Sequence, residues 1–136
     1  MEQQQLWVEP VGSIIVARLR GVLSTELLLE CQQRVLELVR QTGHARVLYD
    51  ALELIAPDID LVLLQQKLET EKHASLGAIT LRTAILVPNT RIAYLSRIAF
   101  GQFGEEHYTV VYNDMGRALK WLEEPDSLRA DSGLQN

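Results

Sequence analysis

Cysteine is almost absent from this chain of 136 residues: Cys31 is the single one, so no disulfide can form within the chain. The first residues, Met-Glu-Gln-Gln-Gln, have neither the basic charge nor the apolar run of a secretory signal. No apolar run approaches the roughly 20 residues that a membrane-spanning helix needs. We therefore expect a cytoplasmic protein whose membrane contact, if any, is peripheral.

Basic residues are also scarce. The chain has 13 Lys and Arg against 18 Asp and Glu, a net charge of -5 and an isoelectric point near 5.2. Nucleic-acid surfaces need clustered Lys and Arg, and here these residues are spread thinly along the chain. The composition therefore predicts a protein that binds neither DNA nor RNA.

Catalytic signatures are missing as well. The sequence has no Gly-x-Ser-x-Gly elbow, no phosphate loop ending in Gly-Lys-Ser/Thr and no Gly-x-Gly-x-x-Gly fingerprint. Cys31 falls on the apolar stripe of an expected helix, where burial makes a thiol a poor nucleophile. The sequence therefore predicts a protein that is not an enzyme and needs no cofactor.

Acidic and histidine side chains do not form a metal motif. Asp58 and Asp60 stand at an expected helix start, where carboxylates usually cap the helix and face its dipole. Glu69 and His73 share a helix face, but a zinc site needs about four donors and no further Cys or His lies nearby in sequence. We expect no metal site.

The sequence is rich in hydrophobic residues, which make up 47% of it, and this content suffices for one core. We expect a single domain over residues 1–124. Residues 125–136 are polar and aperiodic, and we expect them to form a flexible tail.

Hydrophobic periodicity and turn residues divide the domain into alternating strands and helices. The expected strands are residues 6–9, 13–20, 45–50, 79–87 and 107–112, and the expected helices are residues 24–42, 58–75, 90–103 and 114–124. Strands that are separated by helices pair in parallel. The prediction is an α/β fold: a mixed, mostly parallel sheet of about five strands with an N-terminal hairpin and four helices.

Three stretches give this order a family resemblance. Gly21 precedes a capped helix, Val47-Leu48-Tyr49-Asp50 precedes the central loop, and the chain closes with Tyr112-Asn113-Asp114 followed by Ala118, Trp121 and Leu122. In these features the sequence resembles the STAS (anti-sigma-factor antagonist) domains, and more closely the SpoIIAA-like family. The resemblance implies the STAS fold and a role in protein contacts.

The resemblance also bears on regulation. In regulatory members of the fold, a partner kinase phosphorylates a serine at the start of the helix that follows the central strand. Counted from Asp50, the aspartate before that serine falls on Asp58 and the serine itself falls on Ile59. Because this chain has no hydroxyl there, we expect no phosphoserine switch.

Apolar residues are in surplus around the loop after the central strand. The second helix is expected to turn Leu61, Leu64 and Leu68 toward the core, which leaves the other apolar residues of its first turns pointing elsewhere. We hypothesise a site for a lipid-like ligand or a partner's apolar segment, at Asp50, Leu54, Ile55, Ile59, Val62, Leu63, Tyr94 and Ile98.

Other interpretations remain open for these residues. The apolar side chains can instead complete the core, and Asp50 can accept hydrogen bonds from loop amides. Leu29 and Leu36 fall opposite the core stripe of the first helix, so a homodimer that uses them and the third helix is the alternative function.

Overall fold

The structure is a computed structural model that describes residues 4–124. The tail expected over residues 125–136 lies outside the described residues, as do residues 1–3 of the expected domain.

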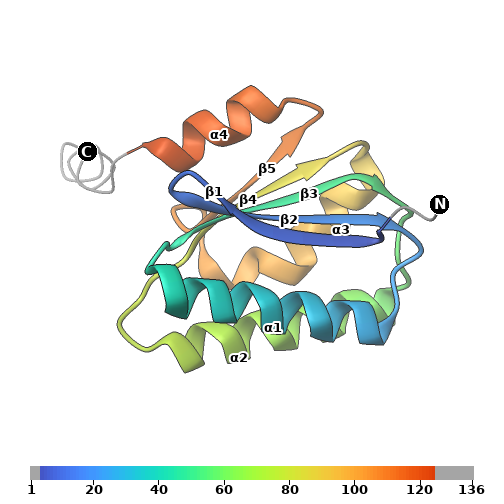
Figure 1. The fold of residues 1–136 in the computed structure, drawn as a ribbon. Coiled ribbons are helices and arrows are strands. Elements are labelled where there is room, and N and C mark those ends of the chain that lie inside the picture. Colours follow the sequence, from blue (N-terminus) through green and yellow to red (C-terminus); the bar gives the residue numbers. More distant parts are fainter. Residues whose placement is uncertain (1–3, 125–136) are drawn as a thin grey trace.

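A five-stranded sheet forms the centre of the molecule, with its strands in the order β1-β2-β3-β4-β5 (Figure 1). The strands are β1 Leu6–Val11, β2 Ile14–Gly21, β3 Arg46–Leu54, β4 Arg82–Val87 and β5 Tyr108–Tyr112. β1 and β2 form an antiparallel hairpin at one edge, and every other pair of neighbours is parallel. The predicted mixed sheet with its N-terminal hairpin is confirmed.

Four α-helices cover the sheet, as predicted. They are α1 Thr25–Thr42, α2 Ile59–Leu76, α3 Thr90–Phe100 and α4 Met115–Glu123, and a short 3-10 helix, η1, spans Gly101–Phe103. α1, α2 and α3 lie on one face of the sheet and α4 lies on the other (Figure 1). Two separate apolar clusters follow from this arrangement, a large one under the three helices and a small one under α4.

Side-chain caps explain why three of the helices begin where they do. Ser24, Asn89 and Asp114 each accept a hydrogen bond from a backbone N–H in the first turn of α1, α3 and α4. Asp58 occupies the same position before α2, but its side chain makes no such bond. Side chains therefore cap α1, α3 and α4, whereas the cap expected from the Asp58 carboxylate is not made.

The central strands are buried on both faces because helices lie on each side. Successive residues of β3 alternate between the two clusters: Tyr49 packs in the large cluster and Leu48 in the small one. All six residues of β4 are buried, including Arg82 and Thr83, which the sequence places in an otherwise apolar run.

The predicted end of the central strand is wrong. β3 continues past Asp50 to Leu54, because its pairing with β2 resumes after a register shift between Arg18 and Arg20. Asp50 therefore lies within the strand instead of at its carboxyl end.

The predicted inner face of α2 is also only partly right. Leu68 is buried, whereas Leu61 and Leu64 are only partly buried. Val62, which was expected to point away from the core, is 4% exposed. The reason is that α2 packs on α1 and α3 as well as on the sheet side, so it buries a wider arc than one stripe.

Candidate functional site

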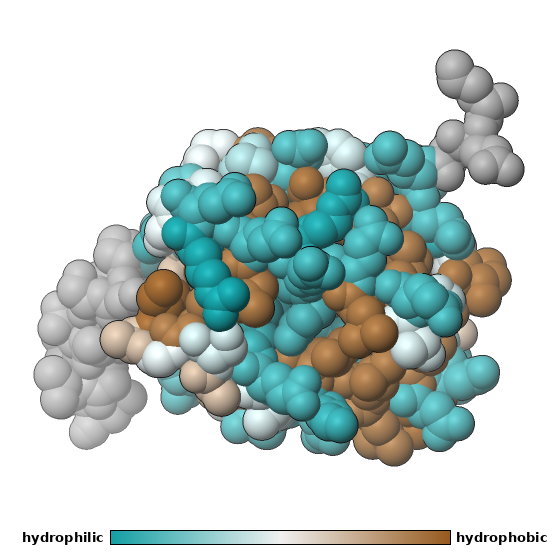
Figure 2. Space-filling model, turned by 60° about the horizontal axis from the view of Figure 1, so that its bottom comes forward, coloured by the Kyte–Doolittle hydropathy of each residue, from teal (hydrophilic) through white to brown (hydrophobic). Residues whose placement is uncertain are grey.

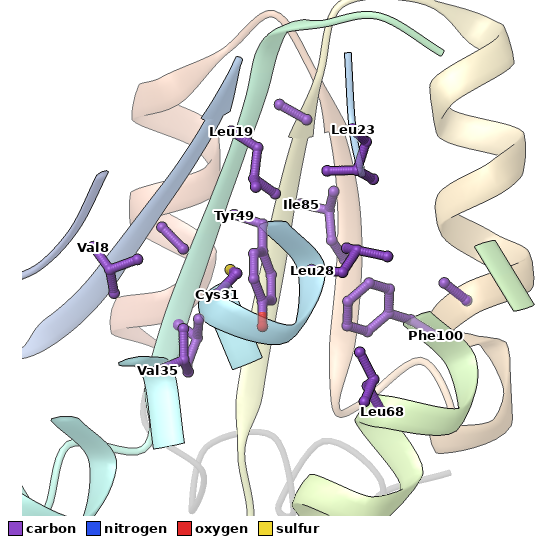
Figure 3. Packing of buried hydrophobic residues seen from close by; sticks show 14 of the residues in the cluster. Val8, Leu19, Leu23, Leu28, Cys31, Val35, Tyr49, Leu68, Ile85 and Phe100 are labelled. Atoms are coloured by element: carbon purple, nitrogen blue, oxygen red, sulfur yellow. The ribbon is translucent and has the colours of Figure 1, made fainter. Parts of the chain in front are cut away.

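An apolar pocket of about 80 Å³ lies between the sheet and helices α1, α2 and α3. Its lining comes from β2, β3, β4 and all three helices, and it is almost entirely aliphatic and aromatic. Figure 3 shows part of this wall, where Leu19, Leu23 and Leu28 converge with Ile85 around Tyr49. A cavity of this volume has room for a few carbon atoms of an apolar group, which is less than the roughly 300–1,000 Å³ of pockets for drug-sized ligands.

The connection between β3 and α2 forms one side of the pocket. Leu54 at the end of β3 and Pro57 in the loop both line it. The backbone N–H of Ile55 donates to the carbonyl oxygen of Gly21 at 3.0 Å, which joins this loop to the end of β2. Proline fixes the backbone before the helix, so the loop enters α2 in one conformation.

Exposed apolar side chains accompany the pocket. Ile55, Ile59, Leu63 and Tyr94 are 57%, 50%, 48% and 63% exposed, and each lies within two residues of one that lines the pocket. Figure 2 shows this helical face of the molecule, where an apolar area interrupts an otherwise mixed surface. Exposed apolar side chains beside a pocket favour a binding site.

The residues expected to form the site fall into three groups. Leu54 and Val62 line the pocket itself. Ile98 is half-buried against the large cluster, and its carbonyl oxygen accepts a hydrogen bond from the Gln66 side chain at 3.2 Å, which joins α3 to α2. The remaining apolar members are exposed: Ile55, Ile59, Leu63 and Tyr94.

Asp50 is separated from this site. It points to the face that α4 covers, opposite the pocket, because it follows the alternation of Leu48. Its carboxylate accepts hydrogen bonds from Arg18 Nε at 2.9 Å and from the Leu52 backbone N–H at 3.1 Å. The Arg18 guanidinium in turn lies 5.4 Å from the Trp7 ring. These contacts give Asp50 a structural role in joining β2 and β3.

Sequence reasoning missed a buried polar cluster behind the pocket. Lys72 Nζ donates to Glu69 Oε2 at 2.9 Å and to the Tyr49 hydroxyl at 2.7 Å. The Tyr49 hydroxyl donates to Glu69 Oε2 at 3.2 Å, and the Gln65 side-chain amide donates to the same oxygen. Glu69 and Lys72 are 0% and 1% exposed. The available signal was a Glu and a Lys three apart on a helix beside a strand tyrosine.

Burial also changes the proton affinities near the pocket. Desolvation raises the pKa of the Cys31 thiol to about 12. Burial, followed by the nearby charge of Glu69, raises the pKa of Tyr49 well above its usual value. Both groups therefore keep their protons at neutral pH and are poor nucleophiles.

His73 lies beyond the buried cluster on α2. Its ring stacks on Phe103, with 4.0 Å between ring centroids, and burial lowers its pKa. Among residues 4–124, no three His, Cys, Asp or Glu side chains are placed to bind a metal ion. The same part of the chain contains no helix with the length and apolar character to cross a bilayer.

Solved structures share this architecture. The unphosphorylated anti-sigma factor antagonist SpoIIAA matches with a TM-score of 0.60 and 17% identity, over 92% of this chain and 96% of that one. An anti-sigma factor antagonist from Mycobacterium paratuberculosis matches with a TM-score of 0.59 and 13% identity, over 88% and 93%.

A third structure is an uncharacterized DUF3478-family protein from Shewanella loihica PV-4, described as having a SpoIIAA-like fold. It matches with a TM-score of 0.55 and 17% identity, over 90% of this chain and 98% of that one. No protein-family model matches the sequence. No curated protein matches it either. The predicted STAS or SpoIIAA-like fold is therefore confirmed by structure, at identities that establish the fold alone.

Proposed function

We propose that this chain is a non-enzymatic STAS-like interaction module that binds a small apolar, lipid-like ligand in the pocket between the sheet and α1, α2 and α3. The observation that carries the proposal is an apolar pocket accompanied by exposed Ile59, Leu63 and Tyr94. Covering such apolar surface with an apolar ligand removes it from water, which lowers the free energy. The two neighbours named as anti-sigma factor antagonists are regulators by name, which supports a binding role.

A partner protein's apolar segment is the second candidate occupant. Such a segment can contact the four exposed residues Ile55, Ile59, Leu63 and Tyr94. These side chains add apolar area outside the pocket, where a small ligand does not reach. Both occupants use the same end of the molecule, at the β3 to α2 connection.

This module works without a phosphoserine switch at the position that the STAS resemblance indicates. Ile59 is the first residue of α2 and is half exposed. Its side chain has no hydroxyl to accept a phosphoryl group.

Native mass spectrometry of protein purified from cells, followed by organic extraction, tests ligand binding. We expect a bound apolar molecule in the wild type and its loss in Val62→Phe, which fills the pocket from inside. Val11→Phe is the matched control, because it makes the same substitution at a 50% exposed residue of β1 that does not line the pocket. A clean apo mass for the wild type, with an empty extract, rejects the ligand half of the proposal.

The partner half needs a different pair of variants. Leu63→Asp places a charge among the exposed apolar residues, whereas Val11→Asp does so at the 50% exposed end of β1. We expect only Leu63→Asp to reduce crosslinking to a partner in cells. Equal crosslinking in both variants excludes this surface as the contact.

The homodimer alternative has weaker support. Leu29 is 47% exposed, but Leu36 is partly buried against the large cluster, so α1 does not present the expected pair. Light scattering over a range of concentrations separates this alternative from the others: a strict monomer removes it.

A further inference from the structure

The pocket lining includes the polar side chains of Tyr49, Gln65 and Ser96. Tyr49 and Gln65 donate hydrogen bonds to the carboxylate of Glu69, whereas the Ser96 hydroxyl donates to the carbonyl oxygen of Ile92 within its own helix. Glu69 lies one helical turn after Gln65 on α2, so the two side chains share a helix face. Gln65 therefore connects the apolar pocket to the buried cluster.

The two oxygens of Glu69 are unequally used. Oε2 accepts hydrogen bonds from Gln65, Tyr49 and Lys72. Oε1 is buried and has no hydrogen-bond partner among the described residues. A buried carboxylate oxygen without a partner is energetically costly, so Glu69 depends on the hydrogen bonds to Oε2, one of which comes from Gln65 on the pocket wall.

The pocket wall that the described residues form has no charged side chain. Glu69 and Lys72 form an ion pair at 2.9 Å, and neither residue lines the pocket. A ligand carboxylate or ammonium in the pocket loses its hydration without meeting an opposite charge on the wall. A neutral hydroxyl costs less to bury, and it can donate to the side-chain oxygen of Gln65 or accept from its amide N–H.

We propose that the pocket selects short amphiphiles whose polar end is a neutral hydroxyl, which binds the Gln65 side chain while the apolar chain occupies the space under α2 and α3. This inference rests on the proposed function, because it names the chemical class of the apolar ligand. It makes Gln65 the residue that decides which head group is accepted.

Three six-carbon probes, hexanol, chlorohexane and hexanoate, test the selection at neutral pH by ligand-observed and protein-observed NMR. Hexanol and chlorohexane are both uncharged, but only hexanol donates a hydrogen bond. A wholly apolar pocket prefers chlorohexane, since the hydroxyl of hexanol must leave water. We expect the wild type to prefer hexanol instead and to bind hexanoate most weakly.

Gln65→Leu should reverse the preference between hexanol and chlorohexane, with a change in their affinity ratio of about tenfold or more. Gln33→Leu is the control, because Gln33 is exposed on α1 and does not line the pocket. It should behave like the wild type. NMR spectra of each variant establish that it is folded.

Two failures are distinguishable. If the wild type prefers chlorohexane and Gln65→Leu leaves the ratio unchanged, the hydroxyl selection is wrong while apolar binding stands. If none of the three probes shifts the signals of Ala51 or Ala99, which line the pocket, small-ligand binding in the proposed function fails too.

Discussion

Burying an ion pair removes two charges from water. The ion pair between Glu69 and Lys72 is almost completely buried. The cost is offset only when the geometry is good and neighbouring dipoles add hydrogen bonds. Tyr49 and Gln65 supply those bonds here, so four side chains depend on one another. Such clusters respond strongly to the loss of one member.

Lys72→Met tests this dependence. It leaves the Glu69 carboxylate buried without its cation, and we expect the free energy of unfolding to fall by about 3–5 kcal/mol. Urea denaturation measures the change. Arg34→Met is the control: Arg34 pairs with Glu30 at 3.5 Å on the surface, so its loss should cost less than about 1 kcal/mol. Equal losses in the two variants contradict this account of the cluster.

The buried Cys31 thiol should make the free energy of unfolding depend on pH in the alkaline range. The unfolded thiol loses its proton near pH 9.0, whereas the folded thiol keeps it until about pH 12, so between these values the folded state binds more protons. The free energy of unfolding must therefore decrease as pH rises above 9. We expect the wild type to lose about 1.4 kcal/mol more per pH unit than Cys31→Ala over this range. Parallel pH profiles for the two proteins exclude the effect.

At the scale of elements, the helix starts differ in how they are stabilised. Asn89 Oδ1 accepts from the Ile92 N–H at 2.9 Å, whereas Asp58 contributes only its charge near the start of α2. We expect Asn89→Ala to cost about 1 kcal/mol at any ionic strength and Asp58→Ala to cost about 0.5 kcal/mol that high salt removes. Urea denaturation at low and high salt checks both values. A salt-independent loss in Asp58→Ala contradicts this distinction.

The elements could be predicted from sequence because local signals define them. Alternation in β2, the capping residues and the glycine after α1 each depend on near neighbours. The end of β3 could not be predicted from sequence. It depends on the pairing of Leu54 with Gly21 of β2, which follows a register shift. The buried face of α2 could not be predicted from sequence either, because neighbouring helices bury Val62 together with Glu69 and Lys72.

The candidate site was predicted in part for the same reason. Apolar residues at the start of α2 indicated a binding surface, and Leu54 and Val62 do line a pocket. Asp50 was expected at the end of the strand, but it lies within β3 on the face opposite the pocket, because pairing with β2 continues to Leu54. The place of Gln65 on the pocket wall could not be predicted from sequence, because polar residues on a helix are normally exposed to solvent.

At the scale of the whole molecule, the two faces of the sheet differ in construction. Three helices cover one face and leave the pocket between them, whereas α4 covers the other with a small cluster around Leu48 and Leu86 (Figure 1). The α4 face also contains Asp50 and its partner Arg18. The pocket and the Arg18–Asp50 ion pair thus lie on opposite faces of one sheet.

This uneven packing makes the protein sensitive to hydrostatic compression. Water fills internal space when a chain unfolds, so a cavity of 80 Å³ corresponds to a volume decrease of about 50 mL/mol. Pressure should therefore unfold the empty protein more readily than Val62→Phe, and high-pressure NMR would show Ala51 and Ala99 responding first. A bound ligand would occupy this volume and shift the unfolding transition to higher pressure.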